Sequence, residues 1–170
     1  MADIMVDIEA DGPIPGDYSM ISLGAVVVDD KLDKTFYVEF KPISDKWIPE
    51  ALAVSGYSRE DTLDSPDPAR AIGDFEKWVV RVSAGKQPRF ISDNNGFDWM
   101  FVCWYMWHFL GRNPFGHSST NLGSLYKGLV KDRRQNFKHL RKTKHTHDPV
   151  DDAKGNAEAY LHMQRVMGLR

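Results

Sequence analysis

The sequence predicts one α/β domain, with strands near the N-terminus and helices in the rest of the chain. Two patterns predict this class. The first forty residues contain three short segments in which polar and apolar side chains alternate or valines cluster, as in strands. Later segments repeat apolar side chains every third and fourth position, which is typical of helices. With 170 residues, no repeat and no long linker, residues 1–170 are expected to form one domain.

Three strands are expected in the N-terminal part of the chain. Over Ile4–Asp11, every second side chain is apolar and most of those between are acidic. Met20–Val28 is nearly all apolar, as in a strand covered on both faces. Phe36–Phe40 alternates again. The polar stretch Asp29–Asp33 suits a hairpin between the second and third strands. Glycine and proline indicate a loop over Asp11–Asp17.

Four helices and a further strand are expected after these strands. Their boundaries are indicated by caps, prolines and glycines at the ends of each periodic stretch. The helices are expected from Pro66 or Pro68 to Val82, over Trp99–Leu110, over Leu122–Val130 and from Pro149 to about Gly168, and the strand over Arg89–Ser92. The second helix is apolar almost all round, so we expect it to be buried on most sides, with Trp104, Trp107 and Phe109 in the core.

The composition argues against several classes of protein. A content of 42% hydrophobic, 12% aromatic and 27% charged residues is typical of a globular domain and not of a disordered or fibrous chain. The longest apolar run, Trp99–Trp107, is much shorter than the about 20 residues that span a bilayer. No basic secretory signal is visible at the N-terminus. The single Cys103 suits a buried thiol in a reducing compartment. We therefore expect a cytoplasmic protein with no membrane partner.

Charge is distributed unevenly along the chain, although the net charge is only −2. Residues 1–68 hold fifteen Asp and Glu against five Lys and Arg. Residues 127–147 hold eight Lys and Arg against Asp132 alone. This asymmetry is compatible with an anionic partner, with bound cations, or with an ordinary solvated basic helix.

Asp7 and Glu9 lie two positions apart on the first predicted strand, so their side chains leave the same face of the sheet. Two carboxylates in this position can converge on a hard divalent cation, which prefers oxygen ligands. The alternative is a polar strand end with solvated acids. The apolar neighbours Val6 and Ile8 favour the metal interpretation, because charges beside a core need compensation.

Two further segments supply candidate residues. Asp98 opens the aromatic helix, where an acid can also act only by stabilising the helix N-terminus. His147 precedes the last helix, and Asp152 lies in its first turn, whereas Asp148 is expected to cap that helix. Histidine suits a general base because its pKa lies near neutrality. We expect the neighbouring His145 to be a surface or substrate-side residue.

Together these residues form a candidate two-metal centre. The set is Asp7, Glu9, Asp98, His147 and Asp152. Four carboxylates and a histidine can hold two divalent cations and supply a base, and such centres stabilise the attacking and leaving oxygens of a phosphodiester. The basic segment would then draw a polyanionic substrate toward an acidic site.

The same residues lie in three motifs that resemble those of the DEDDh (DnaQ-like) family of 3′–5′ exonucleases. Val6–Glu9 resembles the first motif, Asp-x-Glu, and Asn95–Asp98 resembles the second. His147 and Asp152 have the His-x4-Asp spacing of the third. The motifs follow in the family's order over nearly the whole chain. Single motifs of this kind are weak, but three in order are specific.

Two departures from the family pattern are visible. Ser55 stands where the family has the histidine of a His-Gly-Ile turn, and Pro149 stands where alanine is common. The compact size and the sequence around Asp98 and Asp152 most resemble small standalone exoribonucleases of the mycobacterial type.

The resemblance implies a ribonuclease H-like fold, an α/β domain whose five-stranded mixed sheet is flanked by helices. It also implies two divalent cations, Mg²⁺ or Mn²⁺, held by Asp7, Glu9, Asp98 and Asp152. His147 would take the proton of the water that attacks the terminal phosphodiester, and a nucleoside 5′-monophosphate would leave. The family likeness is also compatible with a homodimer, which the sequence itself does not indicate.

Single-stranded nucleic acid is the expected partner, with RNA favoured over DNA on family likeness alone. The resemblance places residues beside Glu9 at the 3′-terminal sugar, and the basic segment before His147 is expected to contact phosphates. The expected substrate-binding residues are Ala10, Asp11, Gly12, Lys138, Arg141, Lys142 and Lys144.

Three other functions stay open at this point. The chain could be a nucleic-acid-binding protein with weak or no catalysis, a ribonuclease H-like endonuclease, or a phosphohydrolase of free nucleotides. A histidine five positions before the last acid favours the exonuclease over the endonuclease. Terminal trimming, internal cuts or activity on mononucleotides alone would distinguish them.

Overall fold

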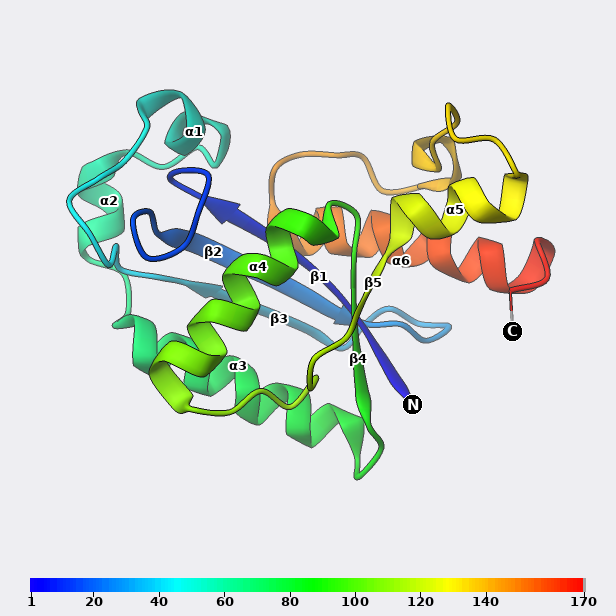
Figure 1. Ribbon diagram of the computed structural model, residues 1–170, viewed down its shortest axis with the longest axis horizontal. Helices are drawn as coiled ribbons and strands as arrows, with labels where there is room; N and C mark the ends of the chain where they lie inside the picture. Colours follow the sequence, from blue (N-terminus) through cyan, green and yellow to red (C-terminus); the bar gives the residue numbers. More distant parts are fainter. Residues whose placement is uncertain (170) are drawn as a thin grey trace.

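The computed structural model describes residues 1–169, and within them five strands form one mixed sheet of order β3-β2-β1-β4-β5 (Figure 1). The strands are β1 (Ala2–Ala10), β2 (Met20–Val27), β3 (Thr35–Glu39), β4 (Pro88–Ser92) and β5 (Ser119–Asn121). β1 pairs antiparallel with β2 and parallel with β4, and β5 adds a parallel edge strand. The predicted ribonuclease H-like α/β fold, with its five-stranded mixed sheet, is confirmed.

Helices cover both faces of this sheet. They are α1 (Pro49–Val54), α2 (Arg59–Leu63), α3 (Pro68–Ser83), α4 (Asn95–Tyr105), α5 (Leu122–Val130) and α6 (Pro149–Val166). The core between the sheet and α3 and α4 contains Ile4, Val6 and Ile8 of β1. The core under α5 and α6 contains Met5 instead. Because side chains alternate along a strand, Asp7 and Glu9 lie on the same face as Met5, toward α6.

Gly24 allows α6 to lie directly against the sheet. This residue pairs with Asp7 in the β1–β2 ladder. A Cβ atom at position 24 would lie 2.3 Å from the carbonyl carbon of Pro149 and 2.4 Å from the amide nitrogen of Val150. The first turn of α6 therefore occupies the space that a side chain on β2 would need, beside the β1 carboxylates.

The predicted end of α6 is nearly correct, and its predicted start is confirmed. Asp148 accepts hydrogen bonds from the backbone N–H groups of Val150 (2.9 Å) and Asp151 (3.1 Å), as an N-cap residue does.

None of the helices in residues 1–169 has both the length and the hydropathy that crossing a membrane requires.

The expectation for the aromatic helix is wrong in part. α4 begins at Asn95, continues as a π-helical turn over Met106–Leu110, and ends at Gly111, as predicted. However, Trp107 is 46% exposed and Cys103 is partly exposed. α4 is an outer layer with only one side against the sheet (Figure 1), so a helix that is apolar all round leaves apolar side chains at the surface.

Gly24→Ala should destabilise the protein, because the new methyl group overlaps the α6 backbone, which cannot move without disturbing the core. Overpacking of this kind costs about 1–3 kcal/mol of unfolding free energy. Urea denaturation measures the loss. The matched control is Gly128→Ala in α5, where the added Cβ meets nothing within 4 Å and stability should stay equal or rise. Equal stabilities for the two variants would contradict this account of the α6 contact.

Candidate active site

Three of the predicted carboxylates converge at the carboxyl-terminal half of β1. Asp7 and Glu9 reach toward α6, and Asp152 comes from the first turn of that helix. Each offers one carboxylate oxygen such that these oxygens lie within 4.8 Å of one another. The arrangement depends on the contact at Gly24, because that contact brings the first turn of α6 beside β1.

Asp98 adds a fourth carboxylate, close enough to Asp7 for its charge to act on that residue. It lies in the first turn of α4, and its side chain is buried. Its Oδ2 atom has no hydrogen-bond partner among the described residues. An unpartnered buried carboxylate oxygen is costly and is usually explained by a ligand, a water or an ion.

Burial, and after it the charge of neighbouring carboxylates, raises the pKa values of three of these groups. Burial, followed by the charges of Asp98, Asp152 and Glu9, raises the pKa of Asp7 well above its ordinary value. Burial, followed by the charge of Asp152, raises the pKa of Glu9 to about 7. Burial is also the main cause that raises the pKa of Asp98 to about 7. Like charges this close cannot all ionise without a compensating cation.

The donor set fits hard divalent cations. All four carboxylates offer oxygen, the ligand that Mg²⁺ and Mn²⁺ prefer. The unpartnered Oδ2 of Asp98 and the raised pKa values of Asp7 and Glu9 both describe groups whose charge is uncompensated by the protein. A bound cation would remove both costs, so the residues present suit the metals that the sequence predicts.

Two histidines, not one, border the carboxylates. Nδ1 of His147 lies 3.7 Å from Oε1 of Glu9, and Nδ1 of His145 lies 2.7 Å from Oδ1 of Asp152. The two rings are 4.3 Å apart between centroids, and both side chains are about half exposed, at 49% for His145 and 46% for His147. The predicted position of His147 beside the acids is observed. His145 was expected at the surface, and its contact with Asp152 is the feature that sequence reasoning missed.

The Asp152 carboxylate also binds the backbone of the loop that carries the two histidines. Its two carboxylate oxygens accept hydrogen bonds from the N–H groups of Thr146 (3.2 Å) and His147 (3.1 Å). His147 itself has a left-handed backbone, with φ at 61°. A non-glycine residue in that region is strained and persists only where its surroundings hold it, often at functional sites.

Arg141 differs from the other predicted phosphate-binding residues. Its side chain is only 8% exposed and pairs with Asp93, with 3.1 Å between Nη2 and Oδ2, and it also donates to Asn156. The positive charge of Arg141 is close enough to oppose part of the upward pKa shift of Asp7. The guanidinium therefore supports the carboxylate group from inside the protein. Lys138, Lys142 and Lys144 are exposed instead.

Ala10 and Gly12 border a pocket of about 340 Å³ beside Glu9. Its other walls are largely apolar and come from the loop after β1, from α1 and from Phe97. Asp11, between them, does not line the pocket. Its carboxylate pairs with Arg59 at 2.8 Å and accepts from the Ser19 N–H at 2.5 Å.

The backbone of Asp11 is also engaged within the protein. Its N–H donates to the Ser19 carbonyl, and its carbonyl accepts from the N–H of Ile48, which precedes α1. Asp11 therefore shapes the pocket wall from behind. The sequence indicated neither its burial nor the helix α1.

Metal-free protein should lose stability as the pH rises. Glu9 and Asp98 hold their protons more tightly in the folded state, where their pKa is about 7, than in the unfolded chain, where it is about 4. Protonation therefore stabilises the folded state. This contribution is complete below about pH 4 and is lost as the pH rises through about 7. Added Mg²⁺ should therefore raise the melting temperature more at about pH 8 than at about pH 5.5, as scanning calorimetry can measure.

Asp7→Asn provides the matched comparison. It removes one of the crowded charges, so the metal-free variant should lose less stability across the same pH range, and the gain from Mg²⁺ should shrink. An equal gain from Mg²⁺ at both pH values in the unsubstituted protein would contradict the role of charge crowding.

Comparisons with known proteins agree with this geometry. The chain is 36% identical over 166 residues to the 3′-5′ DNA exonuclease Cap18 of Escherichia coli, covering 92% of this chain and 88% of the relative. No protein-family model matches the sequence.

Among solved structures, the nuclease domain of 3′hExo, a DEDDh family member bound to rAMP, has a TM-score of 0.79 at 17% identity, over 99% of this chain and 94% of that one. Escherichia coli exonuclease I in complex with single-stranded DNA has a TM-score of 0.75 at 16% identity, over 97% of this chain and 41% of that one. These two likenesses concern the fold. Taken with the relative that is 36% identical, they establish that this chain belongs to the DEDDh (DnaQ-like) family of 3′–5′ exonucleases.

Proposed function

We propose that residues 1–170 form a single exonuclease domain that removes nucleotides from the 3′ end of a single-stranded nucleic acid with the aid of two divalent cations. The observation that carries this proposal is the convergence of Asp7, Glu9 and Asp152, with ligand oxygens within 4.8 Å, next to a histidine. Family membership supports the 3′–5′ direction.

Asp7, Glu9, Asp98 and Asp152 would hold Mg²⁺ or Mn²⁺. When bound, such ions make water more acidic and stabilise negative charge on the phosphoryl oxygens. Asp7 would be a central ligand of this set, because its carboxylate is buried and lies close enough to Glu9, Asp98 and Asp152 for all three charges to act on it. The buried Arg141 offsets part of the negative charge of the carboxylates and keeps Asp93 and Asn156 in place.

His147 is proposed as the general base. Its Nδ1 faces Glu9, so a proton on that nitrogen would point toward a carboxylate and leave Nε2 as the acceptor for the proton of the attacking water. The water oxygen forms a bond to the terminal phosphorus, the bond from phosphorus to the 3′ oxygen of the preceding nucleotide breaks, and that oxygen takes up a proton. The terminal residue then leaves as a nucleoside 5′-monophosphate.

The pocket bordered by Ala10 and Gly12 is proposed to receive the terminal nucleoside. It adjoins Glu9, and its largely apolar walls suit a sugar and base more than a phosphate. Lys138, Lys142 and Lys144 are exposed and suit contacts with phosphates further along the strand. Arg141 and Asp11, also predicted to bind substrate, are proposed to act by positioning their neighbours.

We propose RNA as the first candidate substrate and DNA as the second, because the available observations point to different sugars. The resemblance of the motifs to small exoribonucleases predicts RNA. The relative at 36% identity is named a DNA exonuclease, and this observation favours DNA as the second candidate substrate. Solved structures of similar fold include one with single-stranded DNA and one that concerns a histone mRNA stem-loop.

A homodimer is a further prediction, to be tested by sedimentation.

Substituting the two histidines should separate their roles. His147→Gln should lower kcat by about 10²–10⁴-fold and remove the limb of the pH profile that reports the base. His145→Gln should retain that limb and raise the Mg²⁺ concentration for half-maximal activity about tenfold, because His145 orients Asp152. Steady-state kinetics against pH and Mg²⁺ test both. Loss of the limb in the His145 variant alone would reverse the assignment.

The activity itself is tested with 5′-labelled single-stranded RNA and DNA of one sequence, each with Mg²⁺ or Mn²⁺. A ladder that shortens from the 3′ end is expected, and the preferred sugar is the strand degraded faster. The ladder should vanish with EDTA and in the Asp7→Asn variant, whose folding is checked by circular dichroism. Internal cuts would favour an endonuclease. Release of phosphate from free nucleotides, without cleavage of either strand, would favour a phosphohydrolase. Binding without cleavage would favour a binding protein.

A further inference from the structure

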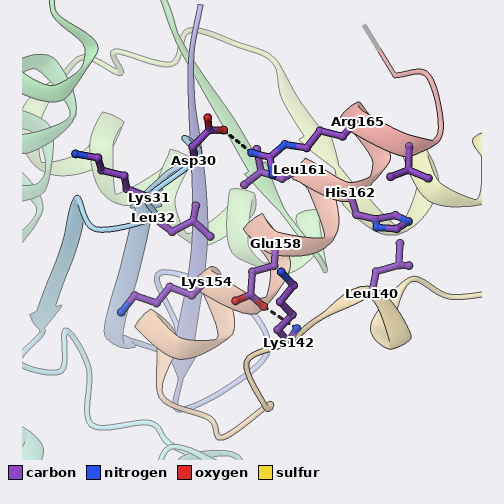
Figure 2. A pocket seen from close by; sticks show the side chains of 11 residues that line it. Asp30, Lys31, Leu32, Leu140, Lys142, Lys154, Glu158, Leu161, His162 and Arg165 are labelled. Atoms are coloured by element: carbon purple, nitrogen blue, oxygen red, sulfur yellow. Dashed lines mark hydrogen bonds and ion pairs between the residues drawn. The ribbon is translucent and has the colours of Figure 1, made fainter.

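A second pocket, of about 560 Å³, lies on the side of α6 that faces away from the sheet (Figure 2). α6 forms one wall, the turn between β2 and β3 forms another, and Leu140 and Lys142 close it from below. None of the four carboxylates of the candidate active site lines this pocket. It is therefore a separate feature of the surface.

Positive charge in the pocket exceeds what its acids neutralise. Arg165 pairs with Asp30 across the pocket. The Glu158 carboxylate accepts hydrogen bonds from the backbone N–H groups of Lys142 (2.7 Å) and Thr143 (2.8 Å), so it serves to hold that loop.

The remaining cations are free to meet a ligand. The ammonium groups of Lys31, Lys142 and Lys154 form no ion pair within the part of the chain that the structure describes. His162 adds a fourth group that can bind an anion. In Figure 2 the ammonium group of Lys142 lies within the recess, whereas those of Lys31 and Lys154 point outward from its rim. Unpaired cations spread along a recess in this way favour binding of an anionic ligand.

The pocket is also partly apolar, and one apolar wall is held in a strained conformation. Leu32 has a left-handed backbone, with φ at 50°. Its N–H and that of Lys31 both donate to Oδ1 of Asp29 at 3.0 Å, which fixes the turn. Leu32 and Leu161 thereby line the same recess as the lysines. An apolar surface beside free ammonium groups suits a ligand that has both a ring and a phosphate.

The spacing along α6 relates this pocket to the candidate active site. Asp152 lies six residues before Glu158 and ten before His162 on the same helix. Lys154, which also lines the pocket, lies only two residues after Asp152, so at about 1.5 Å per residue the pocket extends from about 3 Å to about 15 Å along the helix from Asp152. Phosphates of a stacked strand advance about 3.4 Å per nucleotide, so this range corresponds to about the first five nucleotides of a strand that ends in the active site.

We propose that this pocket binds nucleotide units of an anionic strand, with phosphates on the separate lysines Lys31, Lys142 and Lys154 and a ring against Leu32 and Leu161. The loop from Lys142 to His147 connects the pocket to the active site and carries the exposed Lys144 between them. The favoured source of the nucleotides is the substrate strand, within about five residues of its 3′ end by the same spacing. This inference rests on the proposed function. A free nucleotide shares the same chemistry, and the experiment separates the two sources.

The test measures binding with EDTA present, so that cleavage plays no part. Fluorescence anisotropy compares a labelled twelve-nucleotide strand with a labelled trinucleotide, for the unsubstituted protein and for the double variant Lys31→Ala, Lys154→Ala. Losing two phosphate contacts should weaken binding of the long strand about tenfold and reduce the magnitude of the slope of log affinity against log salt by about 1.4. Trinucleotide binding should change less than binding of the long strand, because a trinucleotide covers only part of the pocket's length.

The matched control is Lys77→Ala, Lys86→Ala, which removes the same charge from α3 and the turn after it, on the other side of the sheet.

A second experiment measures the binding of AMP and dAMP to the same proteins by titration calorimetry. Loss of AMP binding in the pocket variant would assign the site to free nucleotides. No change for any of these ligands, or an equal change in the control, would overturn the proposal. Trinucleotide cleavage with Mg²⁺ reports separately on the proposed function.

Discussion

The close contact between the start of α6 and the sheet at Gly24 is the constraint on which the remaining features depend. Without a side chain on β2 at that position, the first turn of α6 lies directly against the strand pair. Asp152 consequently faces Asp7 and Glu9, and the loop before the helix brings both histidines to the same place. A packing requirement in the core thus determines the geometry of the chemistry.

The cost of this geometry is repulsion among the carboxylates. Most proteins avoid several buried acids in one place, because burial and like charge both oppose ionisation. Here the positive charge of Arg141, held in place by its pairing with Asp93, compensates part of the charge on Asp7. The remaining imbalance favours cations, so the features that make the metal-free protein less stable at neutral pH also provide its affinity for metal.

The strands and the main helices could be predicted from local patterns, because alternation, caps and prolines act over a few residues. The positions of Asp7, Glu9 and Asp152 follow from such patterns together with the family motifs. Other features depend on contacts distant in sequence. Nothing near Arg141 indicates that it is buried against Asp93, 48 residues away. The aromatic run predicted a buried helix, but apolar content does not reveal that only one side of α4 meets the sheet.

The shared use of Asp152 has a consequence for how this enzyme can change over evolution. One carboxylate faces Asp7 and Glu9, binds the ring of His145 and fixes the backbone of His147. In terms of the proposed roles, a single substitution at this position would therefore remove a metal ligand and release the base together, and one change elsewhere would have to replace both contacts. Loss of activity along such a lineage would be abrupt, whereas the lysines outside the centre can be exchanged one at a time with gradual effects on affinity.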